Sequence, residues 1–105
     1  MSRRRLPSRR PCITVEIAHG GCVYAVILGF DPADSWLGEV FAHGAKVGSA
    51  MDGILDYAGI ALSLLLQNGV EPAALASSMG RLGDGTTPAS IIGALADLMT
   101  RETLP

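Results

Sequence analysis

The chain has 105 residues and a mass of 10.9 kDa, and 49% of its residues are hydrophobic, so it can bury one core and is neither multidomain nor wholly disordered. Only 5% of the residues are aromatic, which predicts a core of aliphatic side chains. Residues 1–10 carry five arginines and no acid, and the other residues carry three bases and all ten acids, so charges of +5 and −7 combine to a net −2. A basic arm on an acidic body is therefore expected.

The arm is predicted to span residues 1–11. Pro7 and Pro11 bracket a polar, arginine-rich stretch, and nothing in this segment has the apolar periodicity of a core element. The following residues, 12–105, are predicted to form a single α+β domain.

The first part of the domain, residues 12–47, has a β pattern. Ile13, Val15 and Ile17 alternate with polar or small residues, which predicts a strand with one apolar face. His19-Gly20-Gly21 predicts a turn, with Cys22 opposite a residue near Ala18 and Cys12 opposite Leu28. Residues 22–29, apolar on both sides, predict a central strand, and residues 36–42 predict a third. The expected sheet is a three-stranded antiparallel meander.

From Gly48 the apolar period becomes helical. Ser49 is a plausible N-cap, and Asn68-Gly69 is a typical helix end, which predicts a helix of about five turns. Leu64 and Leu66 widen its apolar arc, so burial on more than one side is expected. Its apolar positions follow the i, i+3, i+4 rule: Met51, Ile54, Leu55, Ala58, Ala61, Leu62 and Leu65.

Two shorter helices are predicted after it. Residues 72–79 begin with Pro72 and end before Gly80, and a third helix begins at Pro88 with Thr87 as its N-cap. The order β-β-β-α-α-α predicts an α+β fold with three helices packed on one face of the sheet.

Cysteine usage and hydropathy favour a cytoplasmic protein with reduced thiols and no membrane association. Cys12 and Cys22 are too few for a disulfide scaffold, and the predicted hairpin separates them. The arginine cluster is not followed by the apolar segment of a secretory signal. The most apolar run, residues 60–66, is far shorter than the roughly 20 residues that span a bilayer.

The sequence contains no pattern that predicts catalytic, cofactor-binding or metal-binding residues. The candidate zinc ligands are the two cysteines and two histidines of the chain. Only His19 and Cys22 are expected to lie close together, and two ligands do not make a tetrahedral zinc site. The serines lack a nucleophile elbow such as G-x-S-x-G. Asp52 and Asp56 lie one helical turn apart, as a catalytic carboxylate pair would, but such residues far more often solvate the polar face of a helix.

The glycine-rich segment Gly80–Thr87 has two interpretations. It resembles a phosphate-binding loop but lacks the lysine and does not follow a strand. Thr86, Thr87 and the N–H groups of the third helix are candidates for holding an anion, with Arg81 nearby. The alternative is a glycine-rich connection with a helix cap.

The arm also has several interpretations. It is a candidate for binding the phosphate backbone of a nucleic acid, for docking on an acidic surface of a partner or of its own domain, or for remaining a solvated tail. The candidate anion or nucleic-acid contacts are Arg3, Arg4, Arg5, Arg9, Arg10, Arg81, Thr86 and Thr87.

Several short blocks, in order, resemble the TSCPD-type domain, which occurs near the C-terminus of adenosylcobalamin (vitamin B12)-dependent class II ribonucleotide reductases and in small stand-alone proteins. The resemblance covers about residues 6–100 and rests on ordered blocks rather than on one invariant motif. The blocks are Leu6–Pro11, Gly38–Phe41, Gly44–Ser49, Ala61–Pro72 and Gly93–Leu98.

The sequence also departs from that family. The Thr-Ser-Cys-Pro-Asp signature and an Asp-x-His-x-x-Gly cobalamin motif do not occur in it. Cys12 and Cys22 do not correspond to the reductase's catalytic cysteines, and a reductase barrel needs more than 105 residues. The resemblance therefore implies kinship with the reductase system and not nucleotide reduction by this chain.

From these observations we expect a non-catalytic accessory or regulatory module that acts through protein contacts. Small and apolar residues on the first helix favour self-association, so a homodimer is predicted, with a ribonucleotide reductase subunit as a further partner. The alternative is a nucleotide- or nucleic-acid-binding protein that uses the arm and the Gly80–Thr87 loop.

Overall fold

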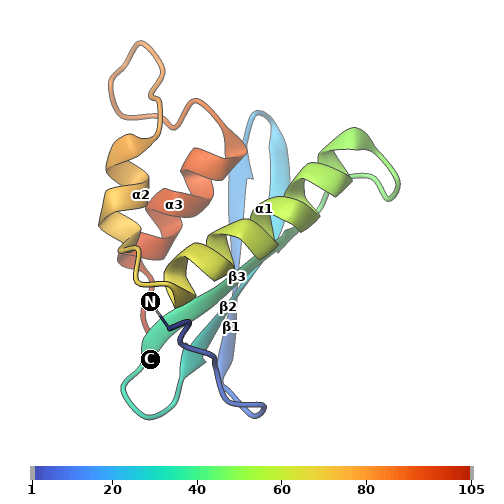
Figure 1. Ribbon diagram of the computed structural model, residues 1–105. Coiled ribbons are helices and arrows are strands. Elements are labelled where there is room, and N and C mark those ends of the chain that lie inside the picture. The colour runs from blue at the N-terminus through green and yellow to red at the C-terminus, as the bar shows by residue number, and fades with distance from the viewer. Residues whose placement is uncertain (1, 105) are drawn as a thin grey trace.

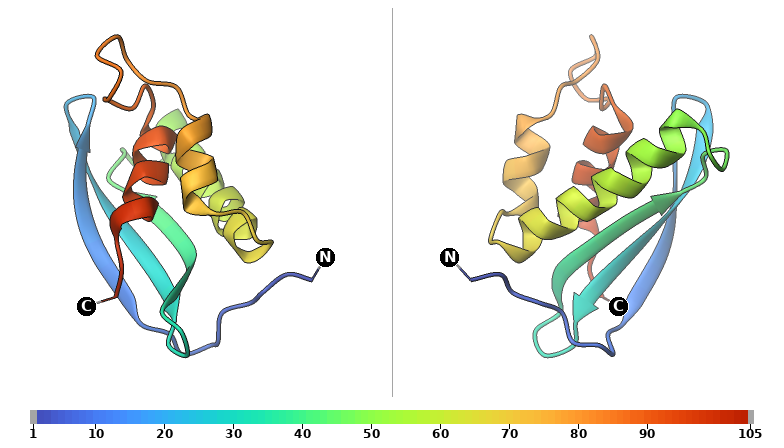
Figure 2. Two further views of the ribbon diagram at one scale, coloured as in Figure 1. Left: turned by 90° about the vertical axis from the view of Figure 1, so that its left-hand side faces the viewer. Right: turned by 45° about the vertical axis from the view of Figure 1, so that its right-hand side comes forward.

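The computed structural model describes residues 2–104; Met1 and Pro105, at the ends of the predicted arm and domain, lie outside the described residues. Its three strands form one antiparallel sheet in the order β1-β2-β3, and the three helices lie on one side of it (Figures 1 and 2). The predicted βββααα fold is confirmed. The elements are β1 (Cys12–His19), β2 (Cys22–Asp31), β3 (Trp36–His43), α1 (Ala50–Gln67), α2 (Pro72–Ser78) and α3 (Ile91–Arg101).

The β1–β2 hairpin turns through two residues. Gly20 and Gly21 have φ angles of +58° and +81°, as a type I′ turn requires, and His19 pairs with Cys22. Cys12 pairs with Gly29, so the expected pairing with Leu28 is wrong by one position, because the turn is one residue shorter than predicted. Both cysteines are free and exposed, at opposite ends of the hairpin.

The core lies between the sheet and the helices, and it is almost wholly aliphatic. Alternate residues of β2 point into it, as expected for a central strand. A bulge opposite Gly29 and Phe30 lets both Leu37 and Val40 of β3 face the core. The largest fully buried side chains are Phe30, Leu28, Leu55, Leu66, Leu95, Leu98, Val26 and Val40.

Helix α1 begins as predicted, because the Ser49 hydroxyl accepts the Asp52 N–H at 3.2 Å. Its inner side packs on β3, where Gly59 allows close approach. The expectation that α1 is buried on more than one side is wrong: Leu66 is buried, but Leu64 is 38% exposed. Helices α2 and α3 pack against each other and leave the outer side of α1 uncovered.

Among the described residues, α1 is the one helix that is long and apolar enough to cross a membrane. Leu55, Leu62 and Leu66 of this helix lie in the protein core. Core helices of globular proteins pass the same test, so the finding is weak evidence for a membrane span.

The starts and ends of the last two helices differ from the prediction. Helix α2 ends at Ser78 rather than at residue 79, and α3 begins at Ile91 with Ser90 as its cap. The Ser90 hydroxyl accepts the Gly93 N–H at 3.0 Å. The prediction of Thr87 as cap and Pro88 as first helical residue is wrong, because Pro88 instead forms a β-bridge with Arg81.

Candidate functional site

The arm lies against the domain rather than in solvent. In Figure 1 it runs from the lower end of β1 to the C-terminal end of α1, and residues 2–11 contain no helix or strand. Two backbone hydrogen bonds fix it, from Arg4 N–H to the Gln67 carbonyl (2.7 Å) and from Phe30 N–H to the Pro11 carbonyl (3.0 Å). The arm is therefore held near both of its ends.

Arg4 binds two aspartates and an aromatic ring. Its guanidinium donates to Asp31 at 3.1 Å and to Asp34 at 2.8 Å, and it lies 4.1 Å from the centroid of the Trp36 ring. The pKa of Asp31 is lowered, first by the N–H of Ala33 and second by Arg4. The charge of Arg4 is thus compensated within the chain.

Arg10 forms a bidentate ion pair with Glu39 of β3. Its Nε and Nη2 donate to the two carboxylate oxygens at 2.6 and 2.7 Å, and its Nη1 donates to the Pro7 carbonyl at 2.8 Å. The Glu39 side chain lies over Gly29, where an added Cβ would come within 2.5 Å of its Oε1. The absence of a side chain at Gly29 therefore makes room for the Glu39 side chain that pairs with Arg10.

The outer edge of β3 is covered by α1 along a line of polar contacts that we call the seam: Arg3, Gly38, Val40, Ser63 and Gln67. The Ser63 hydroxyl accepts the Val40 N–H at 3.0 Å and donates to the Val40 carbonyl at 3.2 Å. Gln67 donates from Nε2 to the Gly38 carbonyl at 2.9 Å and accepts from Arg3 Nε at 2.6 Å. These contacts occupy backbone groups that an edge strand otherwise presents to a partner.

The five arginines of the arm therefore fall into two groups. Arg3, Arg4 and Arg10 bind acceptors of the chain itself, which is the docking on its own domain that the sequence left open. Arg5 and Arg9 are exposed and make no hydrogen bond or ion pair with another described residue.

The Gly80–Thr87 loop binds a carboxylate of its own. The N–H groups of Thr86 and Thr87 donate to Asp84 at 2.9 and 2.8 Å, and the Thr87 hydroxyl donates to the same carboxylate. These hydrogen bonds lower the pKa of Asp84 to about 2. The donors proposed to hold an external anion are therefore already engaged.

Arg81 is also engaged, in a bidentate pair with Asp97 of α3 at 2.5 and 2.7 Å. This pair lowers the pKa of Asp97. Figure 1 shows the loop and the arm at opposite ends of the molecule, so the structure does not bring Arg81, Thr86 and Thr87 together with the arginines of the arm.

The outer face of α1 brings several exposed apolar side chains together on one helix. We define it by Ile54, Tyr57, Ile60 and Leu64, which are 49%, 73%, 49% and 38% exposed. Two hollows of about 350 and 320 Å³ flank Ile60, and Phe41 of β3 lines both. The widened apolar arc pointed to this face in the sequence, but its exposure depends on where α2 and α3 pack.

Metal ligands are not clustered in the part of the chain that the structure describes, where no group of three His, Cys, Asp or Glu side chains is placed to hold an ion. Asp52 has a structural contact, since its carboxylate accepts the Gly48 N–H at 3.0 Å.

Comparison with known proteins gives a consistent result. A family model described as "TSCPD domain" matches residues 3–103. Proteins named "Vitamin B12-dependent ribonucleotide reductase" from Streptantibioticus cattleyicolor and Streptomyces clavuligerus are each 43% identical over 68 residues. The protein of that name from Rhodopirellula baltica is 40% identical over 68 residues. No solved structure matches the chain.

These matches cover most of this chain but only a small part of each relative. The 68 matched residues are 65% of this chain but only 11%, 7% and 6% of the three relatives in the same order. The chain thus corresponds to a small part of the reductases that it resembles.

Proposed function

We propose, on the premise that this chain belongs to the TSCPD domain family, that it is a non-catalytic accessory module of a vitamin B12-dependent ribonucleotide reductase system. It acts by docking on the reductase through the outer face of α1. A cytoplasmic location, where deoxyribonucleotide synthesis takes place, belongs to the same proposal.

The outer face of α1 is the observation that carries this proposal. Asp52 and Asp56 are the only charged residues between positions 50 and 67, and both lie in the first half of the helix. A helix that is apolar nearly all round is normally buried on all sides. Here one side packs on β3, while Tyr57, the most exposed residue of the outer face, is 73% exposed. Contiguous exposed apolar surface of this kind marks a site of protein association.

The size of the relatives supports a reductase as the partner. The matched region makes up 6–11% of their length, so nearly all of each relative lies outside it. A domain that shares its chain with so much other protein has a neighbour available to cover an apolar helix. In the present chain a separate reductase chain would take that place.

The nucleic-acid alternative has less support. Arg3, Arg4 and Arg10 bind acceptors of the chain itself, which leaves Arg5 and Arg9 as the cations of the arm that pair with no other described residue. Two cations supply only a weak, salt-sensitive attraction to a phosphate backbone.

The test is binding to a vitamin B12-dependent ribonucleotide reductase of the same organism, measured by isothermal titration calorimetry. Wild-type protein is expected to bind, and Ile60→Glu is expected to abolish binding, because it places a charge in the centre of the contact. Ser77 is exposed and belongs to α2 rather than to α1, so Ser77→Glu is the matched control and should bind like wild type.

Two results would contradict the proposal. One is the absence of binding by wild-type protein at micromolar concentrations. The other is equal binding by Ile60→Glu and wild type, which would show that the contact lies elsewhere. Circular dichroism of each variant establishes that it is folded.

A further inference from the structure

A separate hollow of about 520 Å³ lies between β1 and α3, away from the outer face of α1. Its volume is within the range of small-molecule sites. Three segments contribute to it: the end of β1, the loop before α3 and one side of α3. The residues used below are Ile17, His19, Leu82, Thr87, Ala94 and Arg101.

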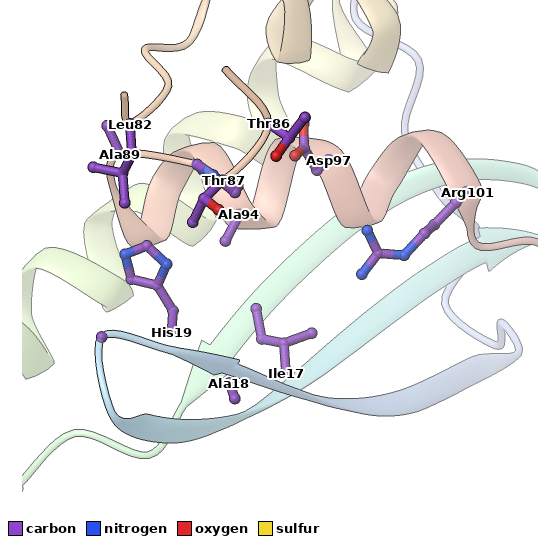
Figure 3. Close-up of a pocket in the computed structure, with 12 residues that line it drawn as sticks. Ile17, Ala18, His19, Leu82, Thr86, Thr87, Ala89, Ala94, Asp97 and Arg101 are labelled. Atoms are coloured by element: carbon purple, nitrogen blue, oxygen red, sulfur yellow. The ribbon is translucent and has the colours of Figure 1, made fainter. Parts of the chain in front are cut away.

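The side chains of this hollow converge. In Figure 3, Ile17 and His19 extend from β1 toward α3, and the guanidinium of Arg101 extends from the last turn of α3 into the same gap. His19 and Arg101 lie at opposite ends, with Ile17 between them. The hollow therefore has a cation at one end, an apolar middle and a polar imidazole at the other end.

The charges around the hollow leave Arg101 uncompensated. Both carboxylate oxygens of Asp97 accept hydrogen bonds from Arg81, so the only acid in the lining is already paired. Thr87 is paired with Asp84. Arg101 makes no hydrogen bond or ion pair with another residue between positions 2 and 104, although it is near enough to help lower the pKa of Asp97.

The apolar lining extends beyond this hollow. A neighbouring hollow of about 550 Å³ shares His19, Gly20 and Ala89 with it and is otherwise lined largely by apolar residues, among them Ile91 and Ile92 of α3 and Ile54 at the edge of the outer face of α1. The two together have room for a ligand with an apolar body larger than the charged group that it carries.

We propose that the hollow between β1 and α3 binds a small organic anion, which is a phosphate monoester or a carboxylate on an apolar body. Arg101 binds the anionic group, since guanidinium forms charge-assisted pairs with both kinds of oxyanion. Ile17, Leu82 and Ala94 contact the body, and His19 hydrogen-bonds the far end. The contacts with Arg101, Ile17, Leu82, Ala94 and His19 all lie in the hollow that α1 does not line, so substitutions there test this site separately from docking by α1.

The test is an NMR titration of ¹⁵N-labelled protein with phenyl phosphate, benzoate and the neutral benzyl alcohol. At least one anion is expected to cause saturable shifts of the Gly20 and Ala94 amides that benzyl alcohol does not reproduce. Binding of phenyl phosphate alone assigns a phosphate monoester, and binding of benzoate alone assigns a carboxylate; either result supports the site.

Variants separate the site from general charge attraction. Arg101→Gln should weaken binding about tenfold or more, and Arg101→Lys should restore part of it. Ala94→Leu should also weaken binding, because it fills the hollow while keeping Arg101. Arg9→Gln removes an exposed cation of the arm and is the control that should bind like wild type.

The proposal is overturned if neither anion causes saturable shifts, if Arg101→Gln binds as tightly as wild type, or if the shifts are confined to residues 2–11. The dispersion of each variant's own amide spectrum shows whether its fold is intact.

Discussion

The seam and the outer face of α1 are two sides of one helix with opposite properties. Along the seam, Ser63 and Gln67 are buried, and their polar groups pair with the backbone of β3 and with Arg3. On the outer face, Tyr57 and Ile60 are exposed and nothing in the described chain covers them. This helix pairs its buried polar side chains internally but leaves apolar side chains exposed.

This difference indicates where affinity for other molecules is expected. The arginine arm, which the charge pattern marks as a binding element, uses Arg3, Arg4 and Arg10 for internal contacts. The outer face of α1 carries no charge and no internal partner. An apolar association is therefore expected to contribute more than an electrostatic one.

The largest effect on stability is expected at the seam side of α1. Gly59→Leu should lower the free energy of unfolding by about 3 kcal/mol, because even a Cβ there would lie 3.1 Å from the Val40 carbonyl oxygen and 2.9 Å from the Phe41 ring. Gly53→Leu is the matched control, since no atom beyond its chain neighbours and the nearby backbone of its own helix lies within 4 Å of its Cβ position, and it should raise stability by about 0.5 kcal/mol. Urea unfolding measures both, and equal effects would show that the two sides of the helix do not differ.

A smaller loss is expected from the polar contacts of the seam. Gln67→Leu should lower the free energy of unfolding by about 2 kcal/mol, because it leaves the Gly38 carbonyl without its buried donor. Arg3→Gln removes only the contact of the arm and should lower it by about 0.5 kcal/mol. If Gln67→Leu is as stable as wild type, the seam is not what holds α1 on β3.

On the outer face, a substitution should change association and leave stability nearly unaltered. Alone in solution, the protein is expected to form a homodimer through this face, with a light-scattering mass of twice 10.9 kDa at micromolar concentration. Tyr57→Glu should give the monomer mass and change the free energy of unfolding by less than about 0.5 kcal/mol. A monomeric wild-type protein would contradict self-association.

The smallest effect concerns the titration of Asp31 beside the arm. Its pKa lies below the ordinary 3.8, so its contribution to stability is fully present above that value and is lost as the pH falls through the folded-state pKa. Arg4→Gln should raise this pKa only partway, because the Ala33 N–H remains. Carboxyl ¹³C NMR measures it, with Arg9→Gln as the unchanged control; an unaltered pKa in Arg4→Gln would show that the arm is not docked in solution.

Local patterns predict much of this fold, because periodicity reports which residues face a core. The alternation of Ile13, Val15 and Ile17 indicates a strand, and Ser49 is the cap of α1 that the sequence suggests. The start of α3 is harder to predict, since both Thr87-Pro88 and Ser90 resemble caps. Thr87 does not cap α3 because its N–H and hydroxyl donate hydrogen bonds to the Asp84 carboxylate instead.

The surface is less predictable, because it depends on contacts between distant residues. Arg4 and Asp34 are 30 positions apart, and no local pattern indicates that they pair. The exposure of Leu64 depends in the same way on where α2 and α3 pack. The hollow between β1 and α3 combines His19 with Arg101, which only the folded arrangement brings to one place.

The position of Arg4 over Trp36 also supplies an optical probe. Trp36 is the single tryptophan of the chain, and its ring lies 4.1 Å from the guanidinium carbon of Arg4. Release of the arm would remove that cation and open the indole to water, so the intrinsic fluorescence of the unlabelled protein should report whether the arm is docked. Tryptophan fluorescence can therefore distinguish partners that displace the arm from partners that bind the outer face of α1.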